Sequence, residues 1–254
     1  MVKPEAPTTQ IAGYDADSVK VRGKDLVHEI MGNFGFVEYA LFQALGEHPT
    51  PTQVRLVEAV MVCIMEHGLI PSAVASRLTY SGAPESFQGA VVAGLLGVGD
   101  RYAGTSSACG KLLEEIVAAA DASACADQIV KDYRERRAPL PGFGHPVHKG
   151  LDPRVNKLLE IARSEPIDGQ FLAALETLQQ SLNQVVSKPL VTNISAAIPA
   201  VLAEAGIPSN LMRGIILIAR CAGLVGHVFE EQSNPIGDDL WHAASDSVTY
   251  DETP

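Results

Sequence analysis

The segment PGFGHPVHKGLDPR, residues 141–154, combines protonatable rings and positive charges with three prolines and three glycines. Its two histidines, His145 and His148, have side chains whose unperturbed pKa of about 6.5 allows proton transfer near neutral pH. Proline and glycine interrupt helices and leave backbone N–H groups free to approach a ligand. The segment therefore indicates acid–base chemistry at a turn that also binds a ligand.

The charge around this segment is opposite to that of the whole chain. From Lys131 to Arg154 the sequence holds six cations and three carboxylates, whereas the chain carries a formal charge of −11. A local positive region suits an anionic ligand. An exposed helix end followed by a loop would give the same pattern, so charge alone leaves both interpretations open.

The histidines do not indicate a metal centre. His145 and His148 would need further ligands, and no cysteine, aspartate or glutamate follows them at the usual spacing. His227 and Glu230 can share a helix face, but a solvated or core histidine explains that pair as well. We expect no metal.

A further histidine, His67, lies in EHGLIPSAVASRL at the end of an apolar helix. A histidine at this place can simply cap the helix C-terminus, where the helix dipole favours it. Because His67 and His145 both lie at breaks between buried helices, they can also converge on one cavity. We expect these two imidazoles to meet in a shared pocket.

The elements that must position these residues are helical. Apolar residues recur at helical spacing in about ten segments, and no segment shows sustained period-two alternation, so we predict an all-α fold. Residues 54–65 are apolar on all faces and predict a central buried helix. We expect a loose arm over residues 1–20 and an irregular tail over residues 235–254.

Two helix starts are marked by capping residues. Thr50 precedes Pro51 and is followed three residues later by Gln53, which is a capping-box pattern. Asp152 precedes Pro153 in the same way, as a cap before the first helical position. We therefore expect helices to begin at both prolines.

Composition excludes some classes of function. The charge of −11 and the isoelectric point near 5.0 argue against nucleic-acid binding and against binding an anionic membrane. We expect no signal peptide and no membrane span, since Arg220 and His227 interrupt the longest apolar run. The four widely spaced cysteines indicate buried, reduced thiols and a cytoplasmic protein. The 46% hydrophobic content favours a homo-oligomer.

Five segments carry a resemblance to a known family. In order and spacing they resemble the citrate synthase superfamily, closest to its short branch of citryl-CoA lyases and the citryl-CoA lyase module of ATP-citrate lyase. The similar region runs from about Val21 to Tyr250. The segments are EHGLIPSAVAS, GLLGVGDRYAG, PGFGHPVHKGLDPR, KPLVTNISAAIPAVLAEAG and ARCAGLVGH.

The resemblance implies a helical subunit with a large and a small domain and the active site in the cleft between them. It also implies a homodimer or larger assembly, acting on an acyl-CoA and a carboxylic acid. The corresponding division is an arm at residues 1–20, the large domain at 21–120, the small domain at 121–210, and the returning large domain with the tail at 211–254.

The resemblance also implies roles for individual residues. His145 and His67 are the implied catalytic groups. Arg154 and Arg220 match arginines that hold substrate carboxylates, for which the guanidinium fork is well shaped, and Tyr102 and Asn193 match further substrate-binding positions. Coenzyme A is implied to bind at Pro141, Gly142, Phe143, Gly144 and Lys149.

Three positions differ from the family pattern. Ser195, in NIS, stands where the family's NVDG supplies a catalytic aspartate, and a hydroxyl is a poor acid near neutral pH. Pro146 stands where an arginine commonly follows the glycine and histidine. Tyr102 replaces the histidine of GPLHG, and an aromatic ring there also occurs in the citrate-cleaving branch.

The resemblance implies a carbon–carbon lyase that cleaves a citryl-CoA-like 3-hydroxyacyl-CoA into acetyl-CoA, or another acyl-CoA, and a keto acid such as oxaloacetate. His145 would take the hydroxyl proton, and His67 with backbone amides of a loop over residues 72–75 would stabilise the thioester enolate. Three alternatives remain. One is a synthase that runs the condensation, and another is a catalytically silent acyl-CoA binding protein, which Ser195 and Pro146 motivate. The third is a helical interaction scaffold, which would bind no acyl-CoA.

The role of His145 leads to a direct prediction. We expect His145→Ala to abolish cleavage with little change in the melting temperature, because a polar cleft residue contributes far less to stability than a core residue. Turnover of citryl-CoA and a thermal melt measure the two effects. Wild-type turnover in this variant would exclude His145 as the base.

Overall fold

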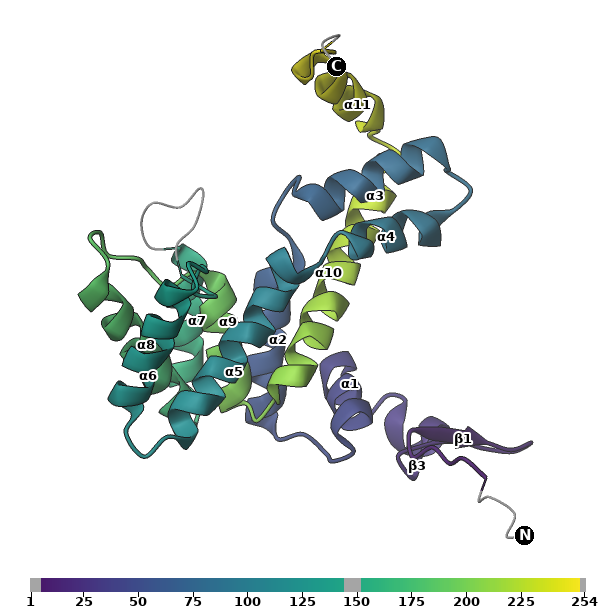
Figure 1. Ribbon diagram of the computed structural model, residues 1–254. Coiled ribbons are helices and arrows are strands. Elements are labelled where there is room, and N and C mark those ends of the chain that lie inside the picture. The colour runs from purple at the N-terminus through teal and green to yellow at the C-terminus, as the bar shows by residue number, and fades with distance from the viewer. Residues whose placement is uncertain (1–5, 144–151, 252–254) are drawn as a thin grey trace, which may run out of the picture. The chain divides into compact units, whose positions relative to one another are not determined.

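The computed structural model describes residues 6–143 and 152–251, and almost all of its regular structure is helical (Figure 1). The predicted all-α class is confirmed. The described α-helices are α1 (Phe36–Leu45), α2 (Pro51–Met65), α3 (Pro71–Gly82), α4 (Phe87–Leu96), α5 (Thr105–Ala118), α6 (Ala122–Glu135), α7 (Pro153–Arg163), α8 (Gln170–Val185), α9 (Ile194–Glu204), α10 (Ser209–Glu231) and α11 (Gly237–Ser247). Two π-helical turns are η1 (Leu26–Ile30) and η2 (Asp100–Gly104).

The chain forms two compact units, Met1–Glu58 and Ala59–Pro254. The first unit contains a small antiparallel sheet of β1 (Ala12–Tyr14), β2 (Val19–Val21) and β3 (Lys24–Asp25) in the order β1-β2-β3. The loose arm expected over residues 1–20 is therefore wrong where these strands pair. Strands of two or three residues are too short to show an alternating pattern. The domain division from the sequence stays a prediction.

In the second unit α10 is the element with the widest packing. It lies against α5 and α9 near its start and against α3 and α4 further on (Figure 1). Leu224 of α10 is buried in one cluster with Ala73 of α3 and Ala90 of α4. α9 lies against α5, α7 and α8, and every residue from Ala196 to Ala203 is buried. These contacts bring helix ends from distant parts of the sequence together.

The glycines of α4 have a packing reason. A Cβ atom on Gly94 would lie 2.7 Å from the carbonyl oxygen of Ser72, so α3 and α4 approach too closely there for any side chain. A Cβ atom on Gly97, just after α4, would lie 3.7 Å from the Cα atom of Ser72, which is an ordinary van der Waals distance. The helix cost of glycine is therefore offset by close backbone packing.

Both predicted capping patterns are confirmed. The backbone N–H of Thr50 donates to Gln53 Oε1 at 2.8 Å, and the N–H of Gln53 donates to Thr50 Oγ1 at 3.2 Å. Asp152 Oδ1 accepts the N–H of Arg154 at 3.0 Å, and Pro153 is the first residue of α7. The helices begin at the prolines as local hydrogen bonding requires.

Three other expectations are wrong. α2 is buried on one face only, and Val62 on its other face is 67% exposed. The tail is not irregular throughout, because α11 forms there with two aspartates in its first turn and packs against α3. Of the four cysteines only Cys109 is fully buried, and burial raises its pKa to about 12. Sequence patterns show where apolar residues lie along the chain, whereas the burial of each residue depends on which other helices pack against it.

Among the described residues α10 alone is long and apolar enough to cross a membrane by length and composition. The expectation of no span counted uninterrupted apolar residues, whereas mean hydropathy tolerates the interruptions at Arg220 and His227. A core helix meets the same criterion, and α10 packs against four other helices. The length of α10 is therefore weak evidence for a membrane span.

Candidate active site

A cavity of about 250 Å³ lies within the second unit. Four residues that the sequence analysis selected line it together: His67, Arg154, Ser195 and Arg220. The other lining residues are mainly apolar: Ile64, Ile70, Pro71, Ser72, Gly97, Val98, Ala103, Ile194 and Ile216. Positions as distant in sequence as 67 and 220 thus meet in one apolar cavity with a few polar groups, which is typical of ligand sites.

Three helices present their N-termini to this cavity. Ile70 and Pro71 begin α3, Arg154 lies in the first turn of α7, and Ser195 lies in the first turn of α9. The first N–H groups of a helix have no partner inside the helix and carry a partial positive charge. Asp152 and Asn193 already accept the N–H groups of Arg154 and Ser195. The helix dipoles and the two arginines still give the cavity a positive potential, which suits an anion.

Arg154 is held in one orientation by a buried carboxylate. Its Nε donates to Asp152 Oδ1 at 3.0 Å and its Nη2 donates to Asp152 Oδ2 at 2.7 Å. The hydrogen bonds that Arg154 donates to Asp152 raise the pKa of Arg154. Because Asp152 occupies the Nε edge of the guanidinium, the edge formed by Nη1 and Nη2 is the one left to meet a ligand carboxylate.

Arg220 is buried, but its charge is not paired with a described carboxylate as that of Arg154 is. It is 6% exposed, and among the described residues no carboxylate forms an ion pair with it. Burial, aided by the nearby charge of Arg154, lowers its pKa, while the charge of Glu66 acts in the opposite direction. A buried charge without a close partner is unfavourable, so an anion in the cavity would stabilise it.

Ser195 lies at the start of α9 beside the predicted coenzyme A segment. The Asn193 side chain caps α9 by accepting the N–H of Ser195 at 2.8 Å, and Asn193 is not among the cavity-lining residues. Backbone pairing joins Phe143 to Thr192, and the N–H of Asn193 donates to the carbonyl of Gly142 at 3.0 Å. Residues 141–143 are therefore fixed next to the helix that carries Ser195.

Gly142 makes this attachment possible. Its φ is 89°, in the left-handed region that favours glycine. A Cβ atom at this position would lie 2.3 Å from the Cβ atom of Ala196 and 3.1 Å from its backbone nitrogen. Any side chain here would separate the segment from α9.

His67 follows the end of α2 and lines the cavity. Its backbone N–H donates to Glu66 Oε1 at 2.8 Å, and the N–H of Gly68 donates to the same atom at 2.6 Å. Gly68 has a φ of 69°, so the chain turns sharply three residues after the last residue of α2. The position of the His67 backbone is therefore set by the Glu66 carboxylate.

Ser72 is a cavity residue that sequence analysis treated only as part of a loop. Residues 72–75 are in fact the first turns of α3, because Pro71 starts the helix. Ser72 is 3% exposed, and its Oγ atom has no hydrogen-bond partner among the described residues. The signal was present, since a serine after an N-terminal proline belongs to a helix N-terminus.

Several predicted residues lie outside this description. Gly144, His145 and Lys149 fall outside the described residues, as does the side chain of Tyr102. Their proposed roles, including the meeting of His67 with His145, stay predictions. Within the residues that are described, no group of three or more histidine, cysteine or acidic side chains is placed to hold a metal.

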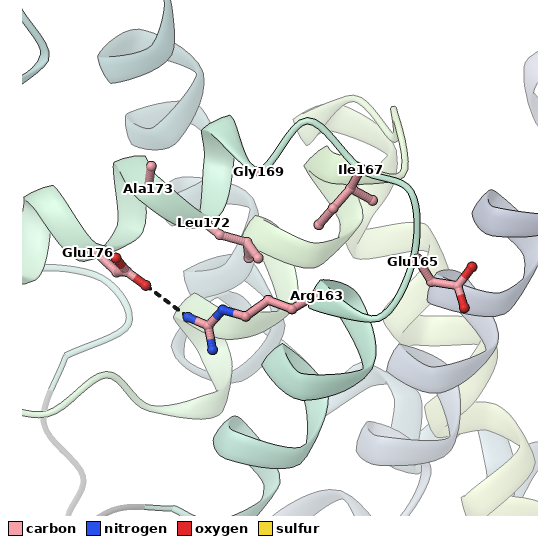
Figure 2. Close-up of a pocket in the computed structure, with 7 residues that line it drawn as sticks. All are labelled: Arg163, Glu165, Ile167, Gly169, Leu172, Ala173 and Glu176. Atoms are coloured by element: carbon pink, nitrogen blue, oxygen red, sulfur yellow. Dashed lines mark hydrogen bonds and ion pairs between the residues drawn. The ribbon is translucent and has the colours of Figure 1, made fainter.

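Another cavity, of about 310 Å³, lies at the turn between α7 and α8 (Figure 2). Arg163 points across it to Glu176, and the two side chains form an ion pair at 2.8 Å with both partners largely exposed. The charges satisfy each other, and none of the predicted site residues lines this cavity. The candidate site is therefore the cavity that His67 and Arg220 line.

Comparisons with known proteins show what the chain is similar to. The family described as "Citrate synthase, C-terminal domain" matches residues 8–240. The solved citryl-CoA lyase of Hydrogenobacter thermophilus is 32% identical, with a TM-score of 0.86 over 97% of this chain and 95% of that chain. The ATP citrate lyase of Methanosaeta concilii shares the fold at 18% identity, with a TM-score of 0.81 over the whole chain and 43% of that protein.

A curated relative, putative citrate synthase 2 of Mycobacterium tuberculosis, is 26% identical over 190 residues, which cover 72% of this chain and 49% of that protein. The chain spans about half the length of the curated relatives it matches.

The packing of Gly142 against α9 predicts a large cost for a side chain there. We expect Gly142→Ala to lower the free energy of unfolding by about 2–4 kcal/mol, from left-handed strain and overlap with Ala196. Gly169→Ala is the matched control, since Gly169 has a φ of 78° with nothing within 4 Å of a built Cβ, and it should cost about 1 kcal/mol. Urea denaturation measures both. Equal losses would contradict the tight contact.

Proposed function

The chain belongs to the citrate synthase family, and from that premise we propose that it is an acyl-CoA carbon–carbon lyase acting on a citryl-CoA-like 3-hydroxyacyl-CoA. The products would be acetyl-CoA, or another acyl-CoA, and a keto acid. The observation that carries the proposal is the buried Arg220, which shares with Arg154 an apolar cavity where three helix N-termini converge. The similarity to the Hydrogenobacter citryl-CoA lyase supports cleavage as the reaction.

Substrate carboxylates would bind to the two arginines. Arg154 offers its Nη1 and Nη2 edge, because Asp152 occupies the other edge. Arg220 gains a partner for its buried charge when a carboxylate enters. Bidentate pairing of guanidinium with carboxylate fixes both orientation and charge, so these residues would place the bond to be broken.

Cleavage needs a proton acceptor, an electron sink and a proton donor. His145 would accept the substrate hydroxyl proton as the carbon–carbon bond breaks and a keto group forms. The bonding electron pair would pass into the thioester as an enolate. His67, the Ser72 hydroxyl and the N–H groups that begin α3 lie around the cavity and would stabilise the enolate oxygen. Protonation of the enolate carbon would complete the products.

The acyl-CoA would extend to the segment of Pro141, Gly142, Phe143 and Gly144, with Lys149 near its phosphates. Attachment of residues 141–143 to the start of α9 supports this, because it places the segment beside cavity residue Ser195. A homo-oligomeric assembly in the cytoplasm belongs to the same proposal. Exposed apolar side chains such as Leu96, which is 81% exposed, favour a partner surface.

A second candidate is a catalytically silent acyl-CoA binding protein. The observation that favours it is Ser195, since the described residues that line the cavity include no carboxylic acid to protonate the enolate carbon.

The same site would also serve the condensation, because cleavage and condensation pass through one transition state. Coenzyme A titration followed by mass spectrometry of products from a panel of hydroxyacyl-CoAs separates these candidates: binding without turnover supports the silent protein.

Arg220 provides the sharpest test of the lyase proposal. We expect the protein to cleave citryl-CoA and Arg220→Gln to lower kcat/KM by about 100-fold or more, because a desolvated charge pair with the substrate is lost. Arg163→Gln, at the exposed ion pair of Figure 2, is the matched control and should match wild type. Product formation followed by mass spectrometry measures both variants. Unchanged cleavage by Arg220→Gln would exclude the proposed carboxylate site.

A substitution of Ser195 tests whether cleavage is limited by the absence of a carboxylic acid at this position. We expect Ser195→Asp to increase citryl-CoA cleavage by about 10-fold or more, because a positioned carboxyl group supplies general acid catalysis. Ser195→Asn is the control, with nearly the same shape and no acid. Initial rates at pH 7 compare the two, and circular dichroism checks that both are folded. If the aspartate variant were no faster than the asparagine variant, the proton would come from another group.

A further inference from the structure

We infer that His227 is a positioning residue that fixes the turn carrying His67, acting through Glu66 and supported by the buried Arg77. The inference rests on the proposed function, in which His67 stabilises the thioester oxygen. His227 lies on α10 and is separated from Glu66 by 161 residues of sequence. It does not line the cavity, so any effect on chemistry must pass through other residues.

The first link joins His227 to the His67 turn. His227 Nε2 lies 3.0 Å from Glu66 Oε2 and 3.1 Å from Oε1. The same carboxylate accepts the backbone N–H groups of His67 and Gly68. Burial disfavours the charge of Glu66, but the hydrogen bonds from His227 and from the His67 backbone outweigh it and lower the pKa of the carboxyl. One ionised carboxylate thus connects α10 to the backbone of His67.

The second link sets the proton on the His227 ring. The Nε–H of Arg77 donates to His227 Nδ1 at 3.0 Å, so Nδ1 must be the acceptor nitrogen. The ring proton therefore lies on Nε2, where it points to Glu66. A hydrogen bond on one imidazole nitrogen commonly fixes the tautomer and orientation of the other.

Arg77 is anchored on its remaining side. It is 2% exposed, its Nη1 donates to Glu231 Oε2 at 2.6 Å, and its Nη2 donates to Glu230. Glu231 Oε1 also accepts the backbone N–H of Gly237 at 2.6 Å. Arg77 therefore has little freedom to move away from His227, and α3, α10 and the start of α11 are tied to one network.

One face of α10 carries both a cavity residue and the residues of the His227 network. Arg220, Gly223, His227 and Glu231 follow one another at spacings of three and four residues and so share a helix face. A Cβ atom on Gly223 would lie 2.1 Å from the carbonyl oxygen of Met65, which shows that α10 touches the end of α2 directly. One rigid helix thus presents a substrate arginine and, two turns later, the residue that holds the His67 turn.

The test uses variants that remove or keep the two hydrogen bonds of His227. We expect His227→Leu to lower kcat for citryl-CoA by about 10- to 100-fold, the usual effect of losing a partner that orients an active-site ligand, with KM changed by less than about threefold. His227→Gln should restore most of kcat, because one amide can accept from Arg77 and donate to Glu66. The control is His242→Leu, whose exposed ring contacts the Asp238 carbonyl and the Trp241 ring in the same unit and none of the residues of the His227 network.

A wild-type kcat in His227→Leu would overturn the inference. So would a loss confined to KM, or a His227→Gln variant as slow as His227→Leu. If His227→Leu does not fold, Glu66→Ala replaces it, because the Glu66 side chain is 49% exposed and its removal leaves the core intact. The same loss of kcat is expected from that variant.

A readout without turnover separates this inference from the proposed function. Hydrogen exchange of the Gly68 amide reports the Glu66 contact directly. We expect about 10-fold faster exchange in His227→Leu than in His242→Leu, whether or not wild type cleaves citryl-CoA. Equal exchange rates would overturn the positioning role, whereas an inactive wild type with the expected difference would reject only the lyase proposal.

Discussion

The structure of the site depends on one buried positive charge. Arg220 lies in the middle of the most apolar long helix, almost fully removed from water, with no ion-pair partner among the described carboxylates. A charge in that position is costly unless something compensates it. The surrounding helix ends add positive potential rather than reducing it. The arrangement is therefore understandable as a receptor for an anion, and poorly understandable as a means of stabilising the fold.

The same constraint explains why α10 must be both apolar and polar. Its apolar residues, such as Leu224 and Val228, pack into the cluster with α3 and α4. Its polar residues lie where they are matched or functional: Arg220 faces the cavity, and His227 and Glu231 join Arg77 in a hydrogen-bonded network. A helix that met only the packing requirement would need neither group. The polar positions of α10 thus mark the cavity and the hydrogen-bonded network beside it.

Much of the site could be predicted because its residues keep local signatures. Helix starts at Pro51 and Pro153 follow from nearest-neighbour hydrogen bonding, and the structure confirms them. His67 was selected at a helix end, Arg154 and Ser195 were selected through the family resemblance, and the three residues line one cavity. What sequence reasoning missed has no local signature. Arg77 and His227 are 150 residues apart, and the sequence around one of them does not indicate that it contacts the other.

The sequence by itself determined the helices, their caps and the residue types available for acid–base and carboxylate chemistry, because these follow from contacts within a few residues. Only the tertiary structure decided which helix ends meet, which face of α2 is buried, and that a tail helix forms where composition indicated irregular chain. It also decided that Arg154 pairs with Asp152, whereas Arg220 has no ion-pair partner among the residues that the structure describes. Burial and ion pairing are set by neighbours that are distant in sequence, and so they exist only once the chain has folded.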